Sequence, residues 1–167
     1  VPARVTRVAN LWNSANELIV QLGAGDIFVG GSVYLSKRPW MTQIFPRAKD
    51  ISVISQGGVA NAEAVLALDP DVIISVAGRA DALIAIGEPV IQMGGGSSME
   101  GLLGEIKILA DALGPEYLNR AQKFSVHVKE TLAYVAGRTA DIPPEKKVRV
   151  HHGSTVSTMI DASISGD

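Results

Sequence analysis

Residues Asn61 to Ser75 read NAEAVLALDPDVIIS, a short helix followed by a corner and a strand. Asn61 can cap the helix by accepting from free backbone N–H groups, and Glu63 stands in the first turn, where the helix dipole favours negative charge. Pro70 ends the helix, because proline disfavours helical geometry in the residue before it. The β-branched run 72–74 predicts a strand covered on both faces. This corner indicates an α/β fold and does not indicate a function.

The same alternation of strand and helix extends over the first 113 residues. Two capping-box patterns, at Ser14–Glu17 and Ser97–Glu100, mark helix starts. We expect strands over residues 5–10, 27–30, 53–54, 72–76 and 89–93, and helices over residues 14–22, 40–44, 62–68, 80–86 and 99–113. Such an order predicts a five-stranded parallel sheet with helices on both faces and right-handed crossovers.

A longer helix follows this sheet. Pro115 suits a helix start, and an apolar stripe continues to Gly137. A polar, proline-bearing linker over 141–147 leads to a predicted strand at 148–151 and a predicted helix at 156–164. We therefore divide the chain into an N-terminal ligand-binding lobe (1–113), a bridging helix (114–140) and the beginning of an incomplete C-terminal lobe (141–167). One such unit cannot bury its own core, so it needs something to pack on.

Composition excludes several classes of protein. Hydrophobic residues make up 47% of the 167, which excludes a disordered chain. The net charge of −2 gives no electrostatic case for a nucleic-acid or anionic-membrane partner. The absence of cysteine excludes disulfides, thiolate metal sites and cysteine nucleophiles. No apolar run is long enough to span a bilayer.

Several motifs together resemble one family. E-x-x-x-A-L-x-P-D-V-I-I begins at Glu63, L-G-A-G-D spans 22–26, V-G spans 29–30, and the long helix follows the lobe. In this order they resemble periplasmic substrate-binding proteins that deliver siderophores, haem, cobalamin and some oxyanions to ABC importers. The resemblance implies a non-enzymatic binding protein that is periplasmic or extracellular and membrane-anchored, as a lipoprotein for example. It also implies that the chain stops after the N-terminal lobe and bridging helix.

Ligands of open parallel sheets bind beyond the carboxyl ends of the strands. Trp12 and Tyr34 offer flat faces with polar tips, although both also suit ordinary packing. In haem-binding members of the resembling family a tyrosine follows the second strand, as Tyr34 does here. Arg79 either pairs with an anion or is solvated. The predicted ligand-binding residues, all in loops after strands, are Trp12, Asn13, Tyr34, Gly58, Arg79, Gly95, Ser97 and His152.

The nature of the ligand stays open. Trp12 and Tyr34 suit a ferric siderophore, haem or cobalamin, whereas helix N-termini, Arg79 and His152 suit an oxyanion such as molybdate or tungstate. We expect no metal site of the protein's own, because His151 and His152 are adjacent in a strand and point to opposite faces. We also expect no cofactor and no catalytic residue.

Two further interpretations concern partners. The resemblance implies that Glu63 meets arginines of the membrane permease, although a glutamate in a first turn is also favoured by the dipole alone. A nucleotide-binding α/β enzyme domain is the alternative from another class, but G-x-G-x-x-G, P-loop and G-x-S-x-G motifs are missing from the sequence. Self-association through the unfinished C-terminal unit is a third interpretation.

Overall fold

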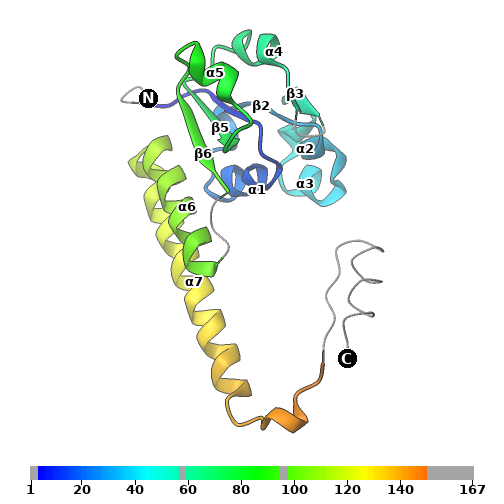
Figure 1. The fold of residues 1–167 in the computed structure, drawn as a ribbon, viewed down its shortest axis with the longest axis vertical. Coiled ribbons are helices and arrows are strands. Elements are labelled where there is room, and N and C mark those ends of the chain that lie inside the picture. Colours follow the sequence, from blue (N-terminus) through cyan, green and yellow to red (C-terminus); the bar gives the residue numbers. More distant parts are fainter. Residues whose placement is uncertain (1–3, 57–58, 95–97, 150–167) are drawn as a thin grey trace. The chain divides into compact units, whose positions relative to one another are not determined.

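The computed structural model describes residues 4–56, 59–94 and 98–149. The chain divides into two compact units, residues 1–128 and residues 129–167. The first unit holds a mixed sheet in the order β4-β3-β2-β1-β5-β6 (Figure 1). Its strands are β1 (Val8–Asn10), β2 (Phe28–Ser32), β3 (Ser52–Gln56), β4 (Val59–Ala60), β5 (Val72–Val76) and β6 (Val90–Met93).

Five of these strands are parallel, which confirms the predicted sheet. β1 stands at the centre and pairs with β5 in the register Val8 to Val72, Ala9 to Ile73 and Asn10 to Ile74. The sixth strand was not predicted. β4 runs antiparallel to β3 at the edge of the sheet, and its two residues are too few to give a periodic pattern.

Seven α-helices belong to the described residues. They are α1 (Asn13–Gln21), α2 (Tyr34–Lys37), α3 (Pro39–Ile44), α4 (Ala62–Leu66), α5 (Asp81–Ala85), α6 (Met99–Leu113) and α7 (Pro115–Thr139). Three 3₁₀ turns lie at Gly25–Ile27, Pro46–Lys49 and Pro144–Lys146. None of the helices that the structure describes is both long and apolar enough to cross a membrane.

Helices cover both faces of the sheet, as the sequence predicts. Alternate residues of a strand point to opposite faces, and the core divides accordingly. Val72 and Ile74 belong to a cluster that includes side chains of α1, α6 and α7. Ile73 belongs to a second cluster, with Val65 of α4 and Leu83 of α5.

The corner at 61–75 forms as its residues dictate. The Asn61 side-chain oxygen accepts from the backbone N–H of Ala64 at 3.0 Å, so the predicted cap is confirmed. α4 ends at Leu66, and Asp69 then adopts a left-handed conformation with φ of 43° before Pro70. The run 72–74 is fully buried.

The structure corrects two local predictions in the N-terminal half. β1 begins at Val8 and not at Val5, because the N–H groups of Thr6 and Arg7 donate to the Asp71 carboxylate. The capping box at Ser14–Glu17 is wrong. α1 begins at Asn13 without a side-chain cap, and the Glu17 carboxylate pairs with Arg38.

Of the predictions for the C-terminal part of the chain, the long helix is confirmed and others are corrected. α6 is capped by Ser98, which accepts from the N–H of Gly101 at 3.1 Å, one residue later than the predicted cap. α7 confirms the long helix and extends to Thr139. Val148 and Arg149 are not in a strand, and Val148 is 82% exposed. The remainder of that predicted strand and the predicted helix at 156–164 lie outside the described residues.

Candidate ligand-binding site

The order of the strands creates a crevice beside β1. The chain proceeds from β1 to β2 and β3 on one side, and β5 and β6 add on the other side. The loops after β1 and β5 therefore leave the same edge of the sheet toward opposite faces. Such a topological switch point is where open α/β sheets bind ligands.

A crevice of about 320 Å³ lies at this switch point. It is lined by residues of the loop after β1, the start of α1 and the loop after β5, namely Leu11, Trp12, Asn13, Ser14, Val76 and Arg79. Tertiary structure thus brings together Trp12, Asn13 and Arg79, which the sequence proposes separately. None of these lining residues carries a carboxylate.

Arg79 contributes a positive charge to the crevice. Gly78, with φ of 77°, allows the tight turn after β5, and the Arg79 N–H donates to the carbonyl of Val76 at 3.1 Å. The Arg79 side chain is exposed, and no carboxylate among the described residues forms an ion pair with it. Its charge is therefore not neutralised by a described neighbour.

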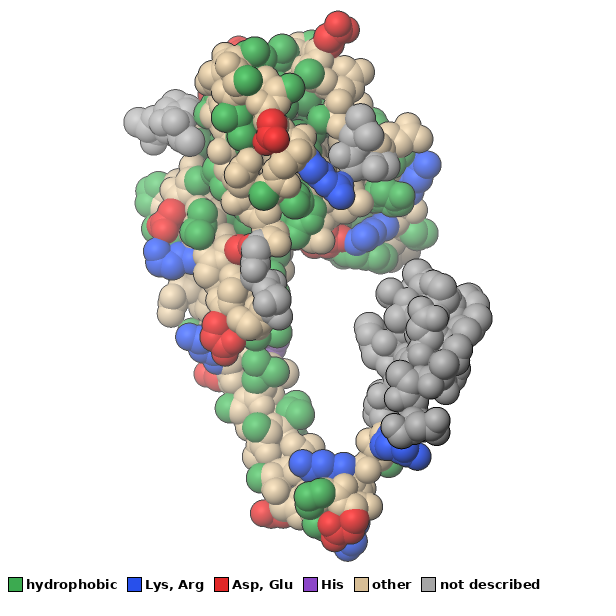
Figure 2. All heavy atoms as spheres, in the orientation of Figure 1, with side chains coloured by type: hydrophobic (Ala, Val, Ile, Leu, Met, Phe, Trp, Pro, Cys, Tyr) green, Lys and Arg blue, Asp and Glu red, His purple; other side chains and the backbone are tan. Residues whose placement is uncertain are grey.

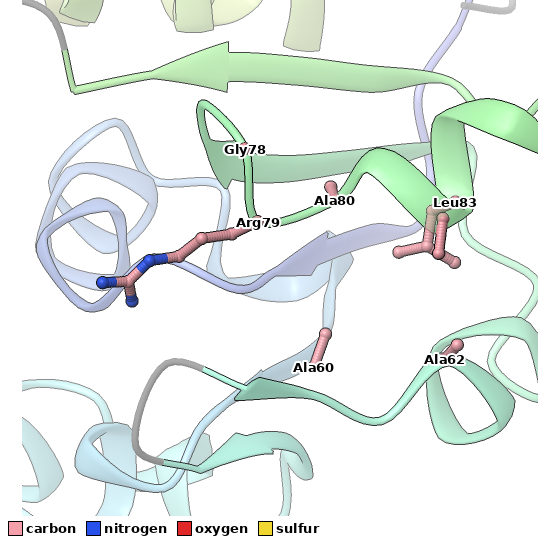
Figure 3. Close-up of a pocket in the computed structure, with 7 residues that line it drawn as sticks. Ala60, Ala62, Gly78, Arg79, Ala80 and Leu83 are labelled. Carbon is pink, nitrogen blue, oxygen red and sulfur yellow. The ribbon is translucent and has the colours of Figure 1, made fainter.

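Arg79 also borders a second pocket of about 320 Å³ (Figure 3). The other lining residues are small or aliphatic: Ala60, Ala62, Gly78, Ala80, Ala82 and Leu83. Figure 3 shows the guanidinium extending away from Leu83 and α5. Arg79 consequently stands between a polar crevice and an apolar pocket at the same edge of the sheet.

A buried polar network supports the loop after β1, and the sequence analysis missed it. Asn10, Asn16 and Ser32 are 0%, 2% and 3% exposed. The Asn10 amide donates to the Asn16 side-chain oxygen at 2.7 Å, and the Asn16 amide donates to the Ser32 hydroxyl at 3.1 Å. The available signal is weak: Asn10 ends an apolar strand, and Asn16 interrupts the apolar face of a helix.

The Trp12 ring packs toward the loop after β6. A Cβ atom added at Gly94 would lie 3.5 Å from the Val76 side chain and 3.8 Å from the Trp12 ring. Gly94 has φ of 96°, and its N–H donates to the Glu105 carboxylate at 2.8 Å. The Trp12 ring therefore lines the crevice close to the backbone of Gly94.

The other predicted site residues lie elsewhere. Tyr34 is the first residue of α2 and is 43% exposed, but it does not line the crevice. Glu63 is exposed in the first turn of α4. Gly58, Gly95, Ser97 and His152 lie outside the described residues, as does His151.

No metal centre is evident in the parts of the chain that the structure describes, where no three His, Cys, Asp or Glu side chains cluster. Two described groups have clearly shifted pKa values, and neither lines the crevice. Hydrogen bonds from Thr6 lower the pKa of Asp71, and burial raises the pKa of Tyr117, with a contribution from Glu116. Figure 2 shows acidic, basic and hydrophobic side chains interspersed over the visible face of the first unit.

Comparison with known proteins gives a consistent family. A family model described as periplasmic binding protein matches residues 8–163. No curated protein sequence matches the chain. Solved structures do match, and the chain spans about half the length of those described next.

Three of these structures illustrate the range of ligands. The molybdate-bound periplasmic binding protein MolA of Haemophilus influenzae aligns with a TM-score of 0.80 at 18% identity, covering 89% of this chain and 53% of that one. The vitamin B12 binding protein BtuF of Vibrio cholerae gives 0.68 at 22% identity, covering 86% and 54%. A periplasmic haem-binding protein of Pseudomonas aeruginosa gives 0.65 at 25% identity, covering 81% and 47%.

Proposed function

The chain belongs to the periplasmic binding protein family, and from this membership we propose that it captures a small solute for delivery to an ABC importer. The family consists of solute-binding components of ABC importers and not of enzymes. In the proposed function the described unit supplies one wall of the binding cleft. The domain limits 1–113, 114–140 and 141–167 are part of this proposal, with α7 as the bridging helix.

The observation that carries the proposal is the crevice between the loops after β1 and β5. It lies at the topological switch point, and its lining combines an aromatic ring, an amide, a hydroxyl and a guanidinium. Ligand sites commonly combine apolar walls with a few polar groups that fix orientation. A solute held here would be bound without covalent chemistry.

A metal chelate of the siderophore, haem or cobalamin type is the first candidate ligand. Trp12 is half-buried at the crevice, so it has a ring face that can contact a flat or bulky solute. Tyr34, exposed after β2, would contact a larger solute extending past the crevice. Vitamin B12 and haem are the ligands of two of the similar proteins.

An oxyanion such as molybdate is the second candidate, and the charge of the crevice favours it. Arg79 is the cation of the lining, Asn13 and Ser14 add hydrogen-bond donors, and a lining carboxylate that would repel an anion is missing among these described residues. Charge-assisted hydrogen bonds to an anion are stronger than neutral ones. MolA binds molybdate.

The proposed partner is an ABC permease, with Glu63 as the docking residue. Glu63 is exposed and forms no ion pair with a described residue, so its carboxylate is available to an arginine of a partner. Delivery to a permease places the working protein in the periplasm or at the outer surface of the membrane.

Native mass spectrometry with elemental analysis of the full-length protein, purified from its source, tests the proposal. Bound iron or cobalt would identify a metal chelate, and bound molybdenum or tungsten would identify an oxyanion. A bound nucleotide would contradict the transport function. The Arg79→Gln variant, purified in parallel, should carry less anion but as much of a neutral chelate.

A further inference from the structure

Asn10 holds both backbone polar groups of Trp12. Its side-chain oxygen accepts from the Trp12 N–H at 3.0 Å, and its side-chain amide donates to the Trp12 carbonyl at 2.7 Å. The same amide group donates its second hydrogen to the Asn16 side-chain oxygen at 2.7 Å. Asn10 is 0% exposed; its bond to Asn16 is buried, and its two bonds to Trp12 are partly buried.

This pattern requires an amide side chain. A carboxamide has one acceptor oxygen and two N–H donors, and Asn10 uses all three functions. Aspartate would keep the acceptor and lose both donors, and an aliphatic residue would lose the acceptor and both donors. Because a buried polar group without a partner is costly, the loop has few alternative conformations.

The network also joins two loops of the ligand edge. The Asn16 side chain bonds to both Asn10 and Ser32, and Ser32 is the last residue of β2. The Trp12 carbonyl accepts a further hydrogen bond from the N–H of Ala15 at 3.0 Å. The end of β1, the start of α1 and the end of β2 are consequently fixed to one another.

We propose that Asn10 is the positioning residue of the ligand crevice, acting through Trp12 on the residues that the solute meets. It sets where the Trp12 ring and the first turn of α1 stand before the solute arrives. A loop that is already ordered does not have to be immobilised on binding, so affinity increases. This inference rests on the proposed function in one respect: that the crevice is the surface that receives the solute.

The test uses Trp12 as its own reporter. These 167 residues hold two tryptophans, so Trp12 is the single reporter in the full-length protein once Trp40 and any tryptophan outside these residues are replaced by phenylalanine. Asn10→Ala and Asn10→Asp are introduced into this background, and quenching of Trp12 emission by acrylamide is measured. We expect quenching to increase over the parent in both variants, because each loses the two amide donors that bond to the Trp12 carbonyl and to Asn16.

Ser32→Ala is the matched control. It removes a hydrogen bond from the same buried network but leaves all three bonds of Asn10 in place. Quenching in Ser32→Ala should stay near the parent value. Equal quenching in Ser32→Ala and Asn10→Ala, or unchanged quenching in Asn10→Ala, would overturn the positioning role. If Asn10→Ala does not fold, Asn10→Asp against Ser32→Ala decides.

Binding supplies a second readout that is separate from the first. Haemin, cyanocobalamin and sodium molybdate are titrated in turn against the parent, and a probe that binds is titrated against the variants. Loss of buried hydrogen bonds that order the loop should weaken binding by about tenfold in Asn10→Asp. Failure of all three probes would count against haem, cobalamin and molybdate as ligands, whereas the quenching result would still decide the role of Asn10.

Discussion

Thr6 and Asp71 are joined at the amino ends of the two central strands. The Asp71 carboxylate accepts from the Thr6 backbone N–H at 2.6 Å and from its hydroxyl at 2.9 Å, and also from the Arg7 N–H at 2.9 Å. These bonds, that of the Thr6 backbone first, lower the pKa of Asp71. Asp71 is therefore a structural anchor at the edge of the sheet opposite the crevice.

Asp71→Asn should lower the free energy of unfolding at neutral pH by about 1–2 kcal/mol, because hydrogen bonds to a charged acceptor are stronger than those to an amide. A lowered native-state pKa stabilises the fold above the ordinary value of 3.8, and this stabilisation disappears as pH falls through the lowered value. The difference between wild type and variant should therefore shrink in acid. Urea unfolding at several pH values measures it.

Asp69→Asn is the control for this prediction. Asp69 adopts a φ of 43°, a conformation that asparagine also tolerates, and its side chain makes no hydrogen bond to a described residue that the structure records. The free energy of unfolding of Asp69→Asn should differ little from that of the wild type at any of these pH values. A similar loss in both variants would mean that the Asp71 hydrogen bonds do not carry the effect.

Arg79→Gln should weaken binding of an anionic solute by about tenfold, because it removes the cation of the crevice and its charge-assisted hydrogen bonds. Thermal stability should be unchanged, since Arg79 is exposed and forms no ion pair among the described residues. Calorimetric titration of the full-length protein with sodium molybdate measures the affinity. Lys37→Gln, which removes an exposed charge away from the crevice, should leave affinity intact.

Glu63→Arg should impair uptake while leaving solute affinity unchanged, because it reverses the charge proposed to meet the permease. Glu100→Arg is a close control: Glu100 is also exposed and is also the second residue of its helix. Both variants lose the same favourable interaction with a helix dipole. Uptake in cells expressing the full-length variants distinguishes them, and equal uptake would contradict the docking role of Glu63.

Gly23→Ala should destabilise the fold by about 1–2 kcal/mol, because Gly23 has φ of 77°, which costs an L-residue energy. A Cβ atom there would also clash with the Arg120 side chain, so the arginine has to move. Gly104→Ala in α6 should instead stabilise by about 0.5–1 kcal/mol, since nothing lies within 4 Å of its Cβ position. Melting temperatures of the two variants should shift in opposite directions.

Local sequence signals predicted the elements whose causes are local. Asn61 sets the start of α4 by capping it, and the apolar run 72–74 forms a covered strand, whereas α4 ends at Leu66, before the predicted stop at Pro70. The failures involve competition from distant residues. Glu17 pairs with Arg38 instead of completing a cap, and Thr6 donates to Asp71 instead of extending β1.

In the candidate site, too, some features follow from local sequence and others only from tertiary packing. The sequence by itself determined that polar and aromatic residues follow the strands, because the alternation of strands and helices fixes where the loops occur. Only tertiary structure decided which loops meet: the strand order brings Arg79 to Trp12 and leaves Tyr34 outside the crevice. The bonds from Asn10 to Asn16 and on to Ser32 likewise exist only once β1, α1 and β2 have packed, since water would otherwise satisfy these side chains.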